Sequence, residues 1–526
     1  MADFSDLVTA TNAVVDPSTS AADLAQIAQL QPSLRPQVAA HPNVYPALLQ
    51  WMETQGTIPV SNPAAAPVGQ VARRRKTPFV IIAAVVVVAV VASLLIILKP
   101  RQAAESGHSS RFNGVSLTTG GGAIAVGCQD SNQHIIIVCA ESDANTRSAS
   151  VATHYGVDGT VGWTKANLGD DTNGQFDAVT VASDGTIIAV GYGTMANTKG
   201  NGHAIVVVAN SDGSLKWAKA YGGSGFEEFT SVAVESDGTI IAAGLTFSTD
   251  GDFPATHGGQ DGTGAGTDAV IAAINPADGS LKWAKAYGGS SADEFNGVAI
   301  AADNTIVAVG DTQSTDGDFP QSAQDATQSG RDAVMAVINQ ADGSIQWAKA
   351  YGGTWDDLFS SVAVAPDGSL VAAGLAGSED GDFPGKHIEG TNSFADALIA
   401  TIDPTSGSLM WASTFGGSAT DQFTSVAVTS DGTIIAAGFT QSTDGDFPPA
   451  RGGKDAVVVS VGSAGTLNWA RTYGGTGDDQ FNDVAVASDG SMVAVGQSAS
   501  TDGDFPAVKG QTDAVLAFLT SDGKLR

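Results

Sequence analysis

A long repeated unit fills the chain from Ala123 to the C-terminus. Each of its seven copies has a Val- and Ala-rich run, an Asp-Gly turn, an Ile-rich run that ends in Gly, and a third apolar run; six copies add a fourth run with a Trp. The second-run anchors, which lie 52, 53, 66, 64, 64 and 58 residues apart, are Ile135, Ile187, Ile240, Ile306, Leu370, Ile434 and Met492. Four strand-length runs at this period are typical of a propeller blade. The pattern therefore predicts an all-β, seven-bladed β-propeller.

One copy shows how such a blade forms. Its four runs are residues 231–234, 239–244, 268–274 and 281–287. Asp-Gly pairs after the first and third runs supply the positive φ angles of tight hairpins, so the first strand folds onto the second and the third onto the fourth. The recurring Trp residues are Trp217, Trp283, Trp347, Trp411 and Trp469. We interpret them as structural, because a ligand-stacking Trp seldom recurs in every unit.

The two ends of the repeat array suggest how the ring closes. The last copy stops at Arg526, where its fourth strand should begin. Residues 112–121 match the register of residues 281–289, with Val115 in place of Trp. We expect this segment to complete the seventh blade, since such a clasp removes open strand edges.

The repeats also resemble a known family. An "xDGxxxxxG" hairpin, an "SxDGDFxxxxGGxDAxV" segment and a "GxxxWxxxYGG" strand recur across residues 112–526. These motifs resemble bacterial β-propeller repeats of the SBBP type. The resemblance implies the propeller fold in a secreted or surface protein, and it implies no particular reaction.

An apolar stretch precedes the propeller. Residues 79–98 contain Ser93 as their one polar member. At about 1.5 Å per residue they span roughly 30 Å, the thickness of a bilayer core. We predict a transmembrane helix. Residues 73–76 are all basic, against Lys99 and Arg101 beyond the stretch, so the positive-inside rule places the N-terminus in the cytoplasm and the propeller outside the cell.

The segment before the membrane is predicted to be helical. Residues 23–30, 34–40 and 45–51 form three short runs. The sequence "DLAQIAQLQPSLRPQVAAHPNVYPALLQWM" resembles the variant leucine-rich repeat module of bacterial membrane proteins. The predicted domains are therefore a cytoplasmic α-helical module (1–56), a linker rich in Pro and Ala with a basic flank (57–78), the transmembrane helix (79–98) and the propeller (112–526).

Charge divides between these parts. Residues 1–101 contain 7 of the 24 Lys and Arg and 5 of the 55 Asp and Glu, so 17 basic and 50 acidic residues follow, a net charge of −33. Nucleic acid is excluded as a partner on this basis, because phosphate binding needs a basic surface. An unidentified extracellular glycan or protein is the expected ligand.

Two acidic segments recur in loops that a propeller places on one face. The first, an Asp-Gly-Asp followed by Phe-Pro, comprises Asp250/Asp252, Asp316/Asp318, Asp380/Asp382, Asp444/Asp446 and Asp502/Asp504. The second lies between blades and comprises Glu227/Glu228, Asp293/Glu294, Asp356/Asp357, Asp421 and Asp478/Asp479. Converging carboxylates suit Ca²⁺, and the hypothesis is a weak calcium site in each such blade. The alternative is that Asp and Gly serve the turns themselves. The Phe after each Asp-Gly-Asp is expected to anchor the loop beneath this face.

Catalysis has little sequence support, and no catalytic residue is assigned. The His residues after the apolar stretch have no repeated placement, and no Ser/His/Asp spacing or phosphate-binding loop is present. The predicted function is a membrane-anchored surface protein whose propeller binds ligands or acts as a scaffold. The alternative is an extracellular enzyme that acts on surface polysaccharide with paired carboxylates.

The cysteines are Cys128 and Cys139, both in the first copy. A hairpin that turns near Gln133 would place them opposite each other, and disulfides persist outside the cell. We therefore predict a Cys128–Cys139 disulfide.

Overall fold

The chain divides into two units, Met1–Val86 and Val87–Arg526. The structure, a computed structural model, describes residues 27, 30, 34, 38, 110–130, 148–166, 173–195, 202–253, 266–319, 330–383, 394–505 and 511–526. The four residues described before residue 110 do not define a helix. The predicted N-terminal helices and the apolar stretch 79–98 therefore lie outside the described residues. Within the described part of the chain, no helix has the length and apolar character needed to cross a membrane.

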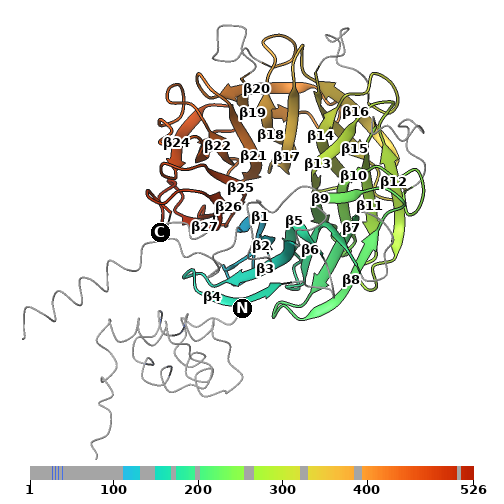
Figure 1. The fold of residues 1–526 in the computed structure, drawn as a ribbon, viewed down its shortest axis with the longest axis horizontal. Coiled ribbons are helices and arrows are strands. Elements are labelled where there is room, and N and C mark those ends of the chain that lie inside the picture. Colours follow the sequence, from blue (N-terminus) through green and yellow to red (C-terminus); the bar gives the residue numbers. More distant parts are fainter. Residues whose placement is uncertain are drawn as a thin grey trace, which may run out of the picture. The chain divides into compact units, whose positions relative to one another are not determined.

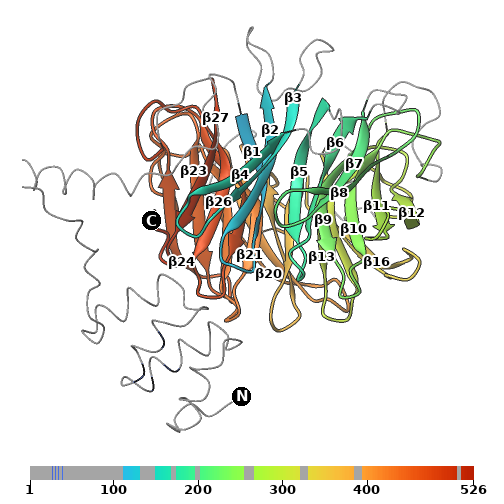
Figure 2. The same ribbon diagram turned by 90° about the horizontal axis from the view of Figure 1, so that it is seen from below.

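The described residues of the second unit form an all-β, seven-bladed propeller, as predicted (Figures 1 and 2). Blades 1 and 2 contain β1 (Ser110–Leu117), β2 (Ala123–Asp130), β3 (Ser148–Tyr155), β4 (Val161–Ala166), β5 (Asn173–Val181), β6 (Ile187–Thr194), β7 (His203–Ala209) and β8 (Leu215–Tyr221). Blades 3 and 4 contain β9 (Glu227–Val234), β10 (Ile240–Thr246), β11 (Asp268–Ile274), β12 (Leu281–Tyr287), β13 (Asp293–Ile300), β14 (Ile306–Thr312), β15 (Asp332–Ile338) and β16 (Ile345–Tyr351).

Blades 5 to 7 repeat this order. They contain β17 (Asp357–Val364), β18 (Leu370–Ala376), β19 (Asp396–Ile402), β20 (Leu409–Phe415), β21 (Asp421–Val428), β22 (Ile434–Thr440), β23 (Asp455–Val461), β24 (Leu467–Tyr473), β25 (Asp479–Val486), β26 (Met492–Ser498) and β27 (Asp513–Leu519). Strands within a blade are antiparallel neighbours, and one bridge between Ala149 and Asn173 joins the sheets of blades 1 and 2. In blade 7 a bridge from Leu519 to Leu525 begins a fourth strand at the C-terminus.

Asp-Gly hairpins set the blade topology, as the sequence pattern predicts. Asp237 Oδ1 accepts a hydrogen bond of 2.8 Å from Thr239 N, and Gly238 has a φ of 87°. This turn pairs Ile240 with Val234. A left-handed φ favours Gly, so the second turn residue is fixed by backbone conformation.

The closure of the ring differs from the prediction. Residues 112–121 do not complete blade 7, because β1 pairs along its length with β2 and is the innermost strand of blade 1. The turn that follows β1, closed by a 2.8 Å bond from Thr118 N to Gly122 O, makes this local pairing geometrically direct. The segment nevertheless seals the ring by packing: Val115 N donates to Asp483 Oδ2 at 2.8 Å, and Asn482 Nδ2 donates to Phe112 O at 2.7 Å.

The first blade is consequently shifted from its predicted register. Its second strand is β2, not the run around Ile135, and Trp163 lies in its outermost strand β4. Cys128 lies near the end of β2 and is buried. Cys139 and the predicted turn near Gln133 lie outside the described residues, so the disulfide stays a prediction.

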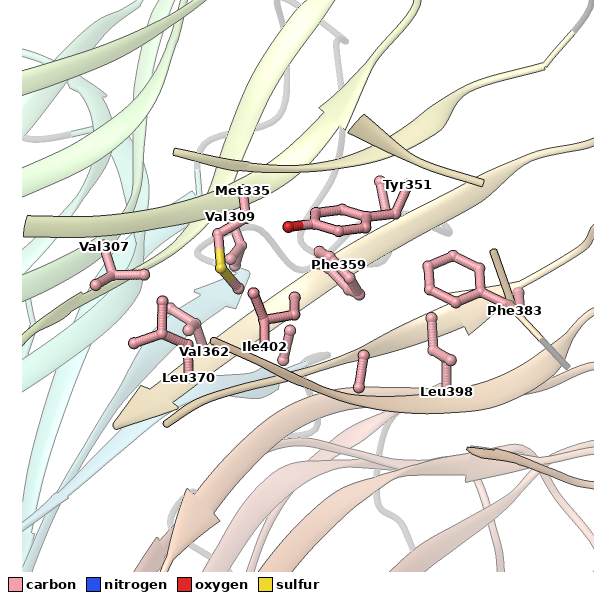
Figure 3. Packing of buried hydrophobic residues seen from close by; sticks show 14 of the residues in the cluster. Val307, Val309, Met335, Tyr351, Phe359, Val362, Leu370, Phe383, Leu398 and Ile402 are labelled. Carbon is pink, nitrogen blue, oxygen red and sulfur yellow. The ribbon is translucent and has the colours of Figure 1, made fainter. Parts of the chain in front are cut away.

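The core lies between the blades. Middle strands such as β14 and β15 are buried at every position, because both of their faces contact neighbouring blades. Figure 3 shows one interblade core, where the Phe359 ring lies 5.9 Å from Tyr351 and 6.0 Å from Phe383 (centroid distances). Phe253 and its copies Phe319, Phe383, Phe447 and Phe505 are at most 4% exposed, which confirms that the Phe of each Asp-Gly-Asp-Phe segment anchors its loop.

The recurring aromatic residues of the outer strands join each blade to the next. Trp283 Nε1 donates to Gln340 O at 2.9 Å, and Tyr287 Oη donates to Gly343 O at 2.7 Å, both in the next blade's outer hairpin. The equivalent indole bonds start from Trp163, Trp217, Trp347 and Trp411. The structural interpretation of these Trp residues is confirmed.

Candidate functional site

The repeated Asp-Gly-Asp segments lie at one end of the blades and hold two loops together. Asp250 Oδ1 accepts a 2.7 Å bond from Ser224 N, and Asp252 Oδ2 accepts a 3.0 Å bond from Gly222 N, both in the connection that enters the same blade. The Gly between them has a φ of 86°, and a Cβ there would lie 2.2 Å from Gly222 O. The sequence prediction that these loops share a face is thus confirmed by their direct contact.

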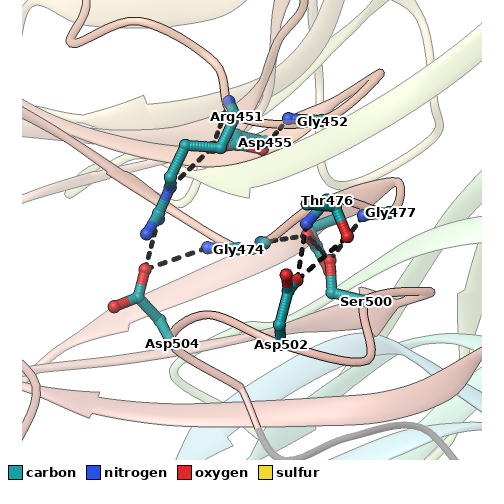
Figure 4. Close-up of polar contacts among 11 residues, drawn as sticks. Arg451, Gly452, Asp455, Gly474, Thr476, Gly477, Ser500, Asp502 and Asp504 are labelled. Atoms are coloured by element: carbon teal, nitrogen blue, oxygen red, sulfur yellow. Dashed lines mark hydrogen bonds and ion pairs between the residues drawn. The ribbon is translucent and has the colours of Figure 1, made fainter.

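The same pair of bonds recurs in the other four blades. Asp316, Asp380, Asp444 and Asp502 accept from the backbone N of Ser290, Thr354, Ser418 and Thr476 at 2.7 to 2.8 Å. Asp318, Asp382, Asp446 and Asp504 accept from the backbone N of Gly288, Gly352, Gly416 and Gly474 at 3.1 to 3.3 Å. Figure 4 shows this arrangement in blade 7, where Arg451 adds an ion pair to Asp504.

Five members of the second acidic set are buried, and each is the first residue of an inner strand (β9, β13, β17, β21 and β25). These residues are Glu227, Asp293, Asp357, Asp421 and Asp479, all at most 1% exposed. Asp421 is representative: it accepts bonds from Gly417 N at 3.0 Å and from Ser442 Oγ at 2.7 Å. These carboxylates therefore fix the same two loops from beneath.

Calcium binding stays a prediction. Backbone and hydroxyl donors bond at least one oxygen of each Asp-Gly-Asp carboxylate and of the buried Asp421 without a cation. Among the residues that the structure describes, no three His, Cys, Asp or Glu side chains form a group suited to a metal ion.

Chelation separates the two explanations. A calcium site predicts that EDTA lowers the melting temperature and that Ca²⁺ restores it with saturation near about 10⁻³ M. Hydrogen bonding alone predicts that NaCl at matched ionic strength stabilises as much as Ca²⁺ does. Thermal melts with CaCl₂, MgCl₂ and NaCl, together with calorimetry, decide between them.

Buried carboxylates predict a pH dependence of stability. Burial raises the pKa of Asp357 to about 7, although four hydrogen-bond donors oppose the rise. An unfolded Asp titrates near 3.9, so the stabilising protonated form is fully present below about pH 4 and is lost as the pH rises through 7. We expect the melting temperature to fall between about pH 4 and 7, with a flatter profile in Asp357→Asn. Parallel profiles would assign the fall to overall charge repulsion instead.

The inner strands line a polar central channel. After its buried Phe, each inner strand places an Asn, Thr, Ser or Asp toward a cavity of about 130 Å³. These residues are Asn113, Asp177, Thr230, Asn296, Ser360, Thr424 and Asn482. Asp483 follows at the next position, where the other blades have Gly, Ala or Ser.

The two channel carboxylates are not repeated, and both have several hydrogen-bond partners. Asp483 accepts from Ser425 Oγ at 2.6 Å and from Val115 N at 2.8 Å, and burial raises its pKa to about 6. Asp177 accepts from Gln175 Nε2 at 2.6 Å, and burial, followed by Glu228, raises its pKa well above the ordinary value. Asp483 of blade 7 thus contacts blades 6 and 1, and Asp177 of blade 2 contacts blade 1 by accepting from Asn113 Nδ2 at 3.3 Å.

A larger pocket, of about 390 Å³, opens over blade 5 on the same face as the acidic loops. Its lining comprises Arg331, Trp355, Asp356, Leu358, Leu375, Gly377, Phe394, Ala395 and Thr420. Trp355 is 51% exposed and Phe394 is 36% exposed. The loop beneath the indole is fixed, since Trp355 N donates to Ser378 Oγ at 2.9 Å and Gly377 N donates to Asp356 O at 2.9 Å.

This pocket exists because blade 5 departs from the repeat. At the position of Trp355, blades 3, 4, 6 and 7 have Gly225, Ser291, Ala419 and Gly477. At the position of Leu358 these four blades have Glu228, Glu294, Gln422 and Gln480. Leu358 pairs across the sheet with Leu375, so an apolar floor replaces a polar one.

Arg331 borders the pocket and is surrounded by acids. Its Nη1 lies 3.0 Å from Asp311 Oδ2 and 3.3 Å from Glu294 Oε1, and its backbone N donates to Asp356 Oδ1 at 2.9 Å. Burial and Glu294 raise the pKa of Asp311, with Arg331 opposing the rise. The guanidinium charge is therefore largely balanced within the protein.

This pocket was not predicted from the sequence. The sequence did contain one indication of it: Trp347 and Trp411 lie in the fourth run of their copies, whereas Trp355 lies after that run. The repeated positions specify the common framework of the blades, whereas this pocket depends on the residues by which blade 5 differs.

Comparisons with known proteins support one part of the N-terminal interpretation. Residues 9–68 match the Leucine Rich Repeat Variant domain, which confirms that resemblance and extends it past residue 56. No curated protein matches the chain.

Solved propeller structures are similar at low identity. Sqt1 from Chaetomium thermophilum is 11% identical with a TM-score of 0.38, covering 76% of this chain and 82% of that one. A catalytically inactive virginiamycin B lyase from Staphylococcus aureus, solved with quinupristin, is 10% identical with a TM-score of 0.42, covering 80% and 98%. Puromycin hydrolase is 13% identical with a TM-score of 0.42, covering 79% and 53%. At such values these structures say nothing about activity.

Proposed function

We propose that this protein is a membrane-anchored surface protein whose propeller binds ligands, with the blade 5 pocket as the binding site. The pocket is the observation on which this proposal depends: a fixed loop presents an exposed indole over an apolar floor that the other blades lack. Ligand sites are concave and mainly apolar, with a few polar groups and a volume of about 300 to 1,000 Å³. The channel cavity is smaller than this range.

The membrane part of the proposal is supported by the sequence. Residues 79–98 are long and apolar enough to span a bilayer, and the four basic residues 73–76 outnumber Lys99 and Arg101. The variant leucine-rich repeat module would then be cytoplasmic, and the propeller, with its predicted Cys128–Cys139 disulfide, extracellular.

Cysteine-accessibility labelling in intact cells tests this topology. In a chain with both native Cys residues replaced by Ser, a single Cys at the exposed Met410 should react with an impermeant maleimide. A single Cys within residues 1–70 should react only after lysis. Labelling of the N-terminal Cys from outside would contradict the topology.

A glycan and cell-wall-fragment array tests ligand binding. We expect the full-length chain to bind at least one fragment class and the Trp355→Gly variant to lose that binding. Binding by neither protein, on an array that detects a control binder, would contradict the binding function.

Asp177 and Asp483 favour a second candidate, an enzyme that acts on surface polysaccharide, because they are unrepeated carboxylates at the channel. Their partners and the small cavity make a sugar-sized substrate hard to accommodate. Release of reducing sugar by the wild-type chain, lost in Asp177→Asn, would establish this candidate.

A further inference from the structure

We infer that the blade 5 pocket binds a cation with an apolar body, of the quaternary or alkylated ammonium class. This inference rests on the proposed binding function of the same pocket. Trp355 and Phe394 supply two exposed aromatic rings to one pocket, over the floor formed by Leu358 and Leu375. The face of an aromatic ring attracts a cation electrostatically, most strongly for Trp. An alkylated ammonium matches both rings and floor, since its charge is spread over an apolar surface.

The charge around the pocket has the sign that a cation requires. Of the described residues that line it, Arg331 alone is cationic, and its guanidinium is already paired with Glu294 and Asp311. Asp356 adds a carboxylate to the lining. The part of the chain after residue 101 has a net charge of −33. The field of this charge raises the local concentration of cations and repels anions.

Other small ligands fit this lining less well. A neutral sugar would bury several hydroxyl groups, and each needs a hydrogen-bond partner to offset its loss of water. The polar side chains in the lining are Arg331, Asp356 and Thr420, and the first is occupied by its ion pairs. An uncharged apolar ligand would fill the pocket but gain nothing from the acidic field.

Calorimetric titration of the full-length chain tests the inference with three matched probes. Choline has the cationic, apolar body; 3,3-dimethyl-1-butanol has the same shape without charge; N-acetylglucosamine represents a neutral sugar. We expect choline to bind about tenfold more tightly than its uncharged analogue. Its affinity should fall as NaCl is raised.

Two variants tie the binding to this pocket. Trp355→Gly and Leu358→Gln each introduce a residue that another blade of this propeller has at the matching position. Both variants should therefore melt near the wild-type temperature. Both should weaken choline binding about tenfold or more. Met410→Ala, at an exposed residue of β20, is the control and should bind as the wild type does.

The outcomes separate this inference from the proposed function. Equal binding of choline and its uncharged analogue, absence of choline binding, or unchanged binding by Trp355→Gly would overturn the ammonium assignment. A Trp355-dependent hit of other chemistry in the array would still leave the binding function standing. If choline binds, sedimentation of the 1–102 deletion, which lacks the proposed transmembrane segment, with phosphatidylcholine but not phosphatidylglycerol vesicles assigns the group to a lipid headgroup. Binding of free choline alone assigns it to a soluble ligand.

Discussion

Deleting residues 1–118, and with them β1, is expected to lower the melting temperature sharply or to cause aggregation. The deletion removes Phe112 and Val115, which are 2% and 5% exposed, from the contact between blades 1 and 7. Burial of such side chains contributes about 1.5 to 3 kcal/mol each. It also leaves the inner edge of β2 and one face of blade 7 uncovered.

The matched control is deletion of residues 1–102, which retains β1. This shorter deletion should keep the cooperative melt of the propeller. If both deletions melt at the same temperature, the packing of β1 does not hold the ring closed.

Phe359→Ala is expected to cost about 3 to 5 kcal/mol, because a fully buried ring leaves a cavity that the surrounding blades cannot fill. Phe359 is 0% exposed and packs between Tyr351 and Phe383. The effect should extend to the binding site, since Phe359 follows Leu358 of the pocket floor.

Urea denaturation provides the comparison, with Phe247→Ala as the control. Phe247 is 46% exposed, and its loss should change the free energy of unfolding by about 0.5 kcal/mol or less. Equal losses for the two variants would mean that the interblade core does not determine stability.

Much of the propeller was predictable from residue periodicity. Asp-Gly hairpins such as Asp237-Gly238 fix local pairing, and a unit with four strands cannot cover both of its faces alone. The Phe after each Asp-Gly-Asp was likewise predictable, since an apolar ring in a polar loop needs a buried place.

Closure was not predicted because two alignments compete at the N-terminal end. Residues 112–115 read Phe-Asn-Gly-Val, as do residues 295–298 of the inner strand β13, yet the prediction matched them to an outer strand. The turn after Leu117 selects the inner-strand alignment, because it pairs β1 with β2. Because β1 was assigned to blade 7, the predicted strands of the first blade were also shifted by one strand.

The candidate site was only partly visible in the sequence. The repeated aspartates were found, but whether Asp250 faces a cation or a backbone N–H depends on a loop 26 residues earlier, which periodicity does not place. The blade 5 pocket combines β17, β18, two interblade connections and the loops that precede β15 and β19. Its volume and its exposed rings follow from their packing in three dimensions.

Hydrogen–deuterium exchange tests whether ligands bind over blade 5. The full-length chain is compared with and without the tightest ligand from the array. We expect slower exchange at residues 353–358 and 375–377, and no change at the matching residues 289–294 and 311–313 of blade 4. Protection confined to the channel strands around Asp177 and Asp483 would contradict this expectation.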